Sequence, residues 1–377
     1  MGSHFGLLVG VIFVLFERGT ITPANAAQGF SLAEATALSP FTSFTNIFKK
    51  KEKHDDGFCH HREYRAFTLQ AVKEAKFSGL FRNLRNQTKF EGSDIATLDG
   101  KYYVVFDSSM SLGYTDDRFS FRGEHNTLIG DRVEESQFEG IAYVPENETW
   151  LLLHESLYHE DSYKPFVTVA KIKPDLSGYD ILDKCKVDFE LTHENKGFEG
   201  IAYVNLNGVP TLLGLCEGNH CQGGSHGRDR GNGKIVVSTL QQTAEDGCVW
   251  SPTSIIDIPS FANFQDYAGM AIHTDLGKIA IVSQEDAAVF VSDFDIETLS
   301  FPDNDSSYRV YHLPRDNHCA KIYCNVEGIQ FLDEYRLVLV SDKAKSKQPF
   351  QCDQKDQSIH IFTFPAGWDP YNAQEEQ

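Results

Sequence analysis

The sequence predicts an all-β protein with the architecture of a five-bladed β-propeller. Three observations support this fold class. One short unit recurs five times, each copy has the pattern of a β-hairpin, and further strand-like runs follow without crossover helices. A six-bladed ring, with a degenerate blade within residues 60 to 88, is the alternative architecture.

Each copy of the repeated unit begins with an aromatic or apolar residue, and a glycine follows two positions later. Its clearest copies read "FEGIAYV" from Phe138 and again from Phe198. The shared glycines are separated by 48, 60, 69 and 59 residues and lie at Gly92, Gly140, Gly200, Gly269 and Gly328. Each copy holds two apolar runs around a turn rich in Asn, Asp or Gly, which is typical of a hairpin. Runs such as "FVTVAKIK" and "CKVDFEL" extend the unit to four strands, and such units must stack around an axis to bury their faces.

The last copy supplies only three strands, which end in "SIHIFTF" at residues 358–364. We expect the missing outer strand in "YRAFTLQAV" from Tyr64, so that an N-terminal strand closes the last blade. By position alone, a disulfide between Cys59 and Cys352 would lock that closure. Of the eight cysteines, two C-x4-C pairs can each close a short loop: Cys216 with Cys221, and Cys319 with Cys324.

The chain divides into a signal peptide at residues 1–26, a leader or linker at 27–58, and one propeller domain at 59–377. The apolar run from Phe5 to Phe16 is too short to span a bilayer and precedes an Ala24-Asn25-Ala26 cleavage pattern. An uncleaved membrane anchor is the alternative for this segment. Three glycosylation sequons and the eight cysteines fit a secreted or lumenal protein; the sequons begin at Asn86, Asn147 and Asn304.

The net charge of −20 limits the partners. It argues against nucleic acid and against an anionic membrane surface once the signal peptide is removed. We expect a monomer that binds a small phosphorylated substrate or an extracellular ligand.

The glutamates of the repeated unit predict a metal site at one mouth of the channel. The innermost strands of a propeller begin around one axis, and the second strand of each hairpin ends beside the start of the first. The metal ligands we predict are Glu91, Glu139, Glu199, Glu327, Asp107 and Asp342, with Glu155 and Glu217 beside them.

A cluster of carboxylates needs a counter-charge. Two carboxylates about 5 Å apart repel by roughly 3 kcal/mol at an effective dielectric near 20, and oxygen ligands favour Ca²⁺. In the alternative, the glutamates accept backbone N–H bonds around a water-filled channel. The fourth copy departs from the pattern at Ala268 and Gln284.

A glycine-rich loop, "EGNHCQGGSHGRDRGNGK" from Glu217 to Lys234, is expected to open on the same mouth. Its guanidinium groups, at Arg228 and Arg230, suit a phosphate group. In the predicted chemistry these arginines offset phosphoryl charge, and one of His154, Glu155 and Glu217 activates water. The alternative is a flexible surface loop with solvated charges.

The repeated "FEGIAYV … LLLHES" and "EGIQFL … LVLVSD" units resemble the phytase-like, SdiA-regulated type of β-propeller domain over most of residues 64–364. The "EGI" strand start is more distantly similar to the soluble calcium-activated nucleotidases. That resemblance implies calcium on the channel axis, held by Glu91, Glu139, Glu199 and Glu327. The expected function is therefore a secreted, calcium-dependent phosphoester hydrolase, phytase- or nucleotidase-like. The alternative is a non-enzymatic extracellular binding propeller with structural calcium.

Overall fold

The computed structural model describes residues 57–366, apart from 85–86, 131–135, 194–195 and 244–246. All of them belong to the second of two compact units, Lys53–Gln377. The predicted signal peptide and almost all of the predicted leader lie outside the described residues, so both stay predictions.

The described strands form antiparallel meanders of four strands each. The first contains β2 (Gly92–Leu98), β3 (Lys101–Phe106), β4 (Ser109–Asp116) and β5 (Thr127–Ile129). The next two contain β6 (Phe138–Val144), β7 (Thr149–His159), β8 (Ser162–Ile172) and β9 (Tyr179–Val187), then β10 (Phe198–Leu206), β11 (Val209–Cys216), β12 (Lys234–Thr243) and β13 (Gly247–Asp257). Another contains β14 (Gly269–His273), β15 (Lys278–Ser283), β16 (Ala288–Asp293) and β17 (Tyr308–His312). The last combines β18 (Val326–Asp333), β19 (Arg336–Ser341) and β20 (Ser358–Thr363) with β1 (Gln70–Lys76).

Helices are short and lie in the connections. The α-helices of the described residues are α1 (Arg62–Ala66) and α2 (Phe77–Leu80). The 3₁₀ turns are η1 (Phe58–His60), η2 (Asn219–Cys221), η3 (His226–Arg228), η4 (Asp305–Ser307) and η5 (Phe350–Gln354). The described part is therefore an all-β fold, as the sequence predicts.

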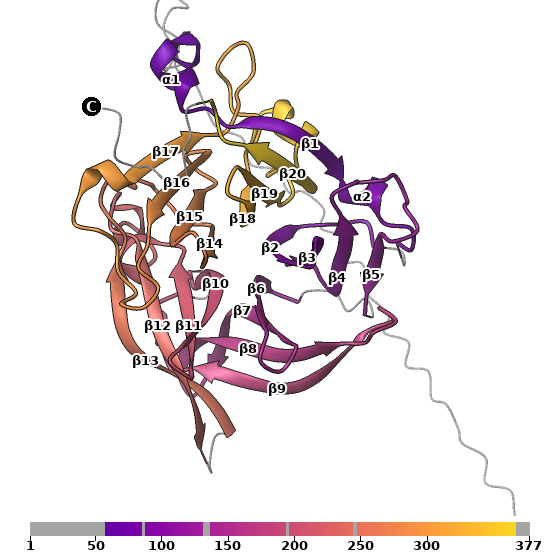
Figure 1. Cartoon of the computed structure of the whole chain (residues 1–377), viewed down its shortest axis with the longest axis vertical. Coiled ribbons are helices and arrows are strands. Elements are labelled where there is room, and N and C mark those ends of the chain that lie inside the picture. The colour runs from indigo at the N-terminus through magenta and orange to yellow at the C-terminus, as the bar shows by residue number, and fades with distance from the viewer. Residues whose placement is uncertain (1–56, 85–86, 131–135, 194–195, 244–246, 367–377) are drawn as a thin grey trace, which may run out of the picture. The chain divides into compact units, whose positions relative to one another are not determined.

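The meanders stand around a common centre, with their first strands innermost (Figure 1). These strands contact one another in the closed order β2, β6, β10, β14, β18 and back to β2. Their approach is close enough to require glycine: a Cβ at Gly269 would collide with the Glu327 carbonyl, and one at Gly328 would collide with the Asp94 backbone. The arrangement is that of a β-propeller, and the glycines serve the backbone packing that the sequence predicts.

The core lies between neighbouring meanders, where side chains of two sheets pack together. Phe77, Phe81, Phe90 and Phe106 form one such cluster, each at most 1% exposed. Two of these phenylalanines come from α2 and its C-cap, which follow directly after β1. The segment "FTLQAVKEAKFSGLFRNL" forms a strand followed by a single helical turn, and the strand pairs with β20.

An N-terminal strand closes the last meander, as predicted. Strand β1 pairs antiparallel with β20, from Gln70 opposite Thr363 to Lys76 opposite Ser358. It begins later than Tyr64, because residues 62–66 form α1.

The disulfides correct two predicted pairings. Cys59 bonds to Cys319, and Cys352 bonds to Cys324, so neither Cys59–Cys352 nor Cys319–Cys324 forms. The turn η1 carries Cys59 to the loop before β18, where the Cys59 N–H donates to Cys319 Sγ at 3.3 Å. The Cys216–Cys221 loop is confirmed.

The fourth disulfide, Cys185–Cys248, joins β9 to β13, beside the point where these strands pair in parallel and merge two meanders into one sheet. Four disulfides are typical of proteins that fold in an oxidising, extracellular or lumenal environment. Within the described ranges, no helix has the length and apolar character needed to cross a membrane.

Candidate functional site

A β-bulge at the start of an inner strand sets the direction of three of the four predicted glutamates. In β6 the pairing with β7 passes from Phe138 to Gly140 and leaves Glu139 as the extra residue. The same shift leaves out Glu199 in β10 and Glu327 in β18. A bulge bends the strand and redirects the side chain of the unpaired residue. The repeated Glu-Gly pair thus combines a redirected carboxylate with a glycine that permits close backbone packing.

These glutamates line a cavity of about 340 Å³, called here the acidic cavity. It contains seven carboxylates, two lysines and two glutamines. The carboxylates are Asp107, Glu139, Glu155, Glu199, Glu217, Glu327 and Asp342, and the other residues are Lys196, Lys345, Gln137 and Gln284. The structure therefore brings together seven of the eight carboxylates that the sequence places at one mouth.

Three of these carboxylates form the most compact group. One oxygen from each of Glu155, Glu199 and Glu217 lies within 4.8 Å of the other two. A backbone hydrogen bond fixes the position of the Glu155 side chain, because its Oε1 accepts the Gly197 N–H at 3.0 Å. Calcium–oxygen distances of about 2.3–2.6 Å place two ligands on opposite sides of the ion roughly 4.6–5.2 Å apart. The group therefore has the donor type and the spacing that fit a calcium ion.

The acidic cavity raises the pKa of its own carboxyl groups. Burial, followed by the nearby Glu217 and Asp107, raises the pKa of Glu155 to about 7 despite the Gly197 N–H. Burial and the neighbouring Glu91 and Asp107 raise the pKa of Asp342 to about 7 as well. For the three bulge glutamates, burial and the surrounding carboxylates raise the pKa well above its usual value. A divalent cation would relieve this repulsion by replacing the bound protons.

Two lysines, which sequence reasoning missed, enter the acidic cavity. Lys196 forms an ion pair with Glu217, and Lys345 Nζ lies 3.2 Å from Gln284 Oε1. Each lies three residues from a predicted ligand, at Glu199 and Asp342. That spacing is too common to have identified them. Two ammonium groups cannot balance seven ionised carboxylates, so without a cation some of the carboxyl groups of the cavity keep their protons.

The first meander corrects the predicted position of Glu91. In β2 the pairing passes from Gly92 to Asp94, so the residue at the bulge is Ser93. Glu91 instead matches Gln137 of the second meander, because its carbonyl accepts the Asp107 N–H as the Gln137 carbonyl accepts the Glu155 N–H. The "FEG" triplet is therefore two residues out of register here. Glu91 is not among the residues that line the acidic cavity.

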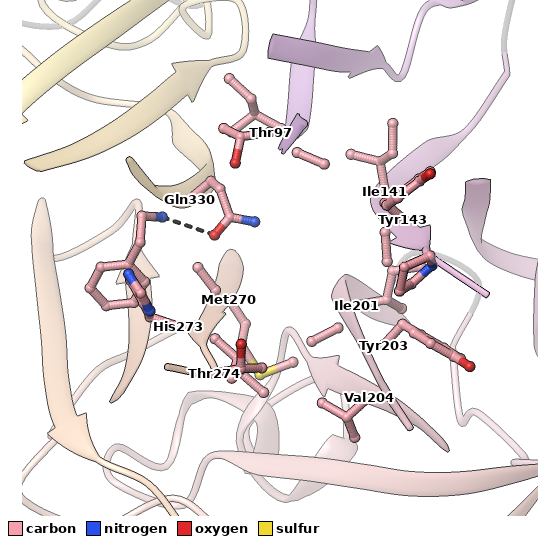
Figure 2. A pocket seen from close by; sticks show the side chains of 18 of the residues that line it. Thr97, Ile141, Tyr143, Ile201, Tyr203, Val204, Met270, His273, Thr274 and Gln330 are labelled. Carbon is pink, nitrogen blue, oxygen red and sulfur yellow. Dashed lines mark hydrogen bonds between the residues drawn. The ribbon is translucent and has the colours of Figure 1, made fainter. Parts of the chain in front are cut away.

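A second cavity, of about 680 Å³, lies at the other end of the inner strands, and we call it the distal cavity. It is lined by residues further along these strands, among them Tyr143, Tyr203, Met270 and Gln330. Figure 2 shows these side chains around one opening, with His273 opposite the two tyrosines. None of the predicted site residues lines it.

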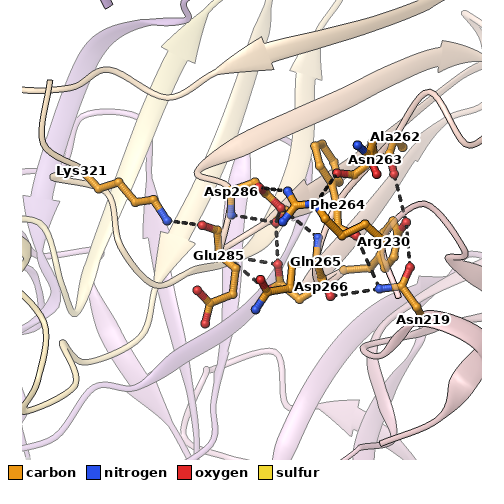
Figure 3. Close-up of polar contacts among 12 residues, drawn as sticks. Asn219, Arg230, Ala262, Asn263, Phe264, Gln265, Asp266, Glu285, Asp286 and Lys321 are labelled. Carbon is orange, nitrogen blue, oxygen red and sulfur yellow. Dashed lines mark hydrogen bonds and ion pairs between the residues drawn. The ribbon is translucent and has the colours of Figure 1, made fainter. Parts of the chain in front are cut away.

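The meander of β14 departs from the acidic pattern and builds a separate polar network instead (Figure 3). Asp266 is buried, and its Oδ1 accepts from the Ser283 hydroxyl at 2.5 Å and from the Glu285 N–H at 3.2 Å. Burial raises its pKa to about 6. Asp286 accepts the Gln265 N–H at 2.9 Å and forms an ion pair with Arg230. These acids do not replace the missing carboxylates, since none of them lines the acidic cavity.

The structure does not bring three of the predicted catalytic residues to the acidic cavity. His154 is 7% exposed, with Nδ1 3.0 Å from the Ser136 carbonyl and Nε2 2.9 Å from Thr168 Oγ1. Burial lowers its pKa to about 4, so it is a neutral core histidine. Arg228 is exposed on η3, and Arg230 forms an ion pair with Asp286. The arginines of this loop therefore face solvent and the β14 meander, and neither lines the acidic cavity.

Comparisons with known proteins find similarity in fold alone. No protein-family model and no curated protein matches the chain. One similar structure is a streptogramin B lyase, at 10% identity over 78% of this chain and 97% of that chain, with a TM-score of 0.38. Another is the soluble aldose sugar dehydrogenase from Escherichia coli, at 10% identity over 77% and 98%, with a TM-score of 0.41. A luciferin-regenerating enzyme matches at 11% identity over 79% and 96%, with a TM-score of 0.42. Similarities this low identify no specific family and carry no functional argument.

Proposed function

We propose that this protein is a five-bladed β-propeller that binds calcium in its acidic cavity and hydrolyses phosphoesters there. The observation that carries the proposal is the group of Glu155, Glu199 and Glu217, whose oxygens lie within 4.8 Å of one another. The blade number is supported by the closed order of contacts among β2, β6, β10, β14 and β18.

The donor set favours calcium over zinc or copper. All three side chains offer carboxylate oxygens, whereas zinc and copper sites in proteins draw on histidine and cysteine. The excess of carboxylates around the group adds long-range attraction for a divalent cation. Calcium bound there would polarise a phosphoryl oxygen and offset developing negative charge.

The remaining side chains of the acidic cavity supply the other roles of a phosphoester hydrolase. Lys196 and Lys345 replace the predicted arginines as partners for the phosphate charge, because both line the cavity. Asp342 lies outside the group of three and has a pKa of about 7, which suits a general base near neutral pH. In this proposal Glu155 and Glu217 hold the metal ion and do not activate water.

The test is phosphate release by the mature protein from phytate, nucleotides and simple phosphoesters, with calcium or with a chelator. We expect release that requires calcium and falls at least tenfold in Glu199→Gln. Arg228→Gln is the matched control and should keep full activity, because Arg228 is exposed outside the cavity. Activity lost in Arg228→Gln but kept in Glu199→Gln would move the site to the loop of residues 217–234.

A second candidate is a non-enzymatic binding propeller in which calcium is structural. The observation that favours it is the position of Arg228 and Arg230 outside the acidic cavity, since a structural site needs no phosphate-binding arginine. This candidate predicts that calcium raises the melting temperature while no substrate is hydrolysed.

A further inference from the structure

We propose that the distal cavity is a second ligand site, which binds a small organic amine with an apolar or aromatic body. The proposal does not depend on the function of the acidic cavity, because the two cavities share no lining residue. It rests on the chemistry of the lining and on one buried carboxylate.

The lining combines aromatic and apolar surface with negative charge. Tyr143, Tyr203, Met270 and Phe331 supply rings and a thioether, and further apolar surface comes from the isoleucines of the inner strands. Such surface suits the body of a ligand, and aromatic rings also attract a cation.

The charged residues of the distal cavity have one sign. Three carboxylates line it, those of Asp94, Glu146 and Asp275. Among the described residues that line it there is no lysine or arginine, and the chain as a whole carries a net charge of −20. An anionic ligand would meet only repulsion here, whereas an ammonium group would be attracted at long and at short range.

Asp94 is the independent observation that points to a ligand. Its side chain is buried, with the residue 1% exposed, and its Oδ2 accepts the Ile141 N–H at 2.9 Å. Its Oδ1 is also buried and makes no hydrogen bond within the described part of the chain. Burial raises the pKa of Asp94 well above its usual value, and the backbone N–H groups of Ile141, Ile95 and Ile329 only partly oppose this. An unsatisfied buried carboxylate oxygen costs about 1–3 kcal/mol or more, and an ammonium group beside it would favour its charged form.

The position of Asp94 strengthens this inference. Asp94 pairs with Val105 as Gly140 pairs with Leu153, so it occupies the place of the close-packing glycine in the neighbouring meander. Asp94 also lines the distal cavity, so the first meander has a carboxyl group at a place where the neighbouring meander has a glycine. We therefore assign Asp94 as the counter-ion of the ligand's ammonium group.

The experiment is calorimetric titration of the mature protein, saturated with calcium, with three probes of one shape. These are 2-phenylethylamine, the neutral 2-phenylethanol and the anionic phenylacetate. We expect the amine to bind at least tenfold more tightly than the alcohol, and phenylacetate not to bind. Equal binding of amine and alcohol, or no binding of the amine at millimolar concentration, would overturn the proposal.

Variants locate the bound amine. Asp94→Asn should weaken amine binding at least tenfold and leave binding of the alcohol unchanged. If that variant does not fold, the exposed pair Glu146→Gln and Asp275→Asn tests the same charge, with an expected weakening of at least threefold. Glu124→Gln is the control and should bind the amine as the parent does, because Glu124 is exposed and lines neither cavity. If Glu155→Gln loses amine binding while Asp94→Asn keeps it, the amine lies in the acidic cavity and the distal site is refuted.

Discussion

A glutamate at the start of an inner strand reaches the acidic cavity only when the β-bulge of its strand falls on it. Glu139, Glu199 and Glu327 occupy the bulge in their strands, and all three line the cavity. Glu91 has the same sequence neighbours but lies two residues before the bulge at Ser93. The backbone register therefore decides which of four similar glutamates line the acidic cavity.

The first prediction compares Glu199→Gln with Glu91→Gln. Glu199→Gln removes a charged oxygen ligand and should weaken calcium binding at least tenfold, or by about 1.4 kcal/mol. Glu91→Gln should change the dissociation constant much less, because Glu91 does not line the acidic cavity. Calorimetric titration of each variant with calcium measures both effects. Equal losses would show that sequence neighbours, and not the bulge, define the ligands.

The second prediction concerns pH. Folding raises the pKa of Glu155 from 4.5 to about 7 and that of Asp342 from 3.8 to about 7. Between these values the folded protein keeps protons that the unfolded chain has lost, so the calcium-free protein becomes less stable as pH rises toward about 7. Bound calcium should remove this loss of stability, because it balances the ionised carboxylates. The melting temperature should therefore respond to calcium more strongly at pH 8 than at pH 5, as a pH series with calcium or chelator measures. A response independent of pH would contradict the raised values.

Strand β1 shows how one element depends on polar contacts far away in the sequence. Most of its residues are exposed, so apolar burial contributes little to its attachment. Glu74 instead accepts from Tyr323 Oη at 2.6 Å, lies 2.9 Å from His360 Nδ1 and pairs with Lys355. These groups, with burial opposing them, lower the pKa of Glu74 to about 2. The network joins β1 to β20 and to the loop before β18.

The third prediction tests this network with Glu74→Ala. His360 is fully buried, so the variant leaves a buried imidazole without its carboxylate and should lose about 1–3 kcal/mol of unfolding free energy. Chemical denaturation measures the change. Val72→Ala on the same strand is the control and should have little effect, because Val72 is 56% exposed. An unchanged midpoint in Glu74→Ala would mean that backbone pairing alone holds β1.

At the scale of the whole molecule, the ends of the described unit meet. The closing meander takes one strand from the N-terminal side and three from the C-terminal side, and Cys59–Cys319 spans 260 residues. A ring of repeated sheets is stable only when its last member is complete, because each sheet packs against two neighbours. The long-range disulfide supports this closure, because it joins the segment before β1 to the loop before β18.

The fourth prediction compares two disulfides. In the chain-entropy model, a bridge over 260 residues contributes about 5.6 kcal/mol and one over 5 residues about 2 kcal/mol. The double variant Cys59→Ala with Cys319→Ala should therefore lose more unfolding free energy than Cys216→Ala with Cys221→Ala. Denaturant titration under non-reducing conditions measures both. The reverse order would show that local packing around the short loop outweighs ring closure.

The amino-acid sequence alone predicts the repeated four-strand units, the N-terminal strand that closes the last one, and the gathering of acids at one mouth. These features depend on the period of apolar residues and on a repeated Glu-Gly pair, both of which are local and visible in one dimension. The prediction of β1 succeeded for the same reason, since the last repeat was one strand short.

The register of the inner strands and the contacts of the site residues could be known only from the folded structure. The bulge at Ser93 excludes Glu91 from the acidic cavity, and burial makes His154 a core residue. The fold also turns Arg230 toward Asp286 and brings Lys196 to Glu217. Strand pairing and the path of a loop depend on contacts between distant segments, so the same triplet of residues can face a cavity in one sheet and miss it in the next.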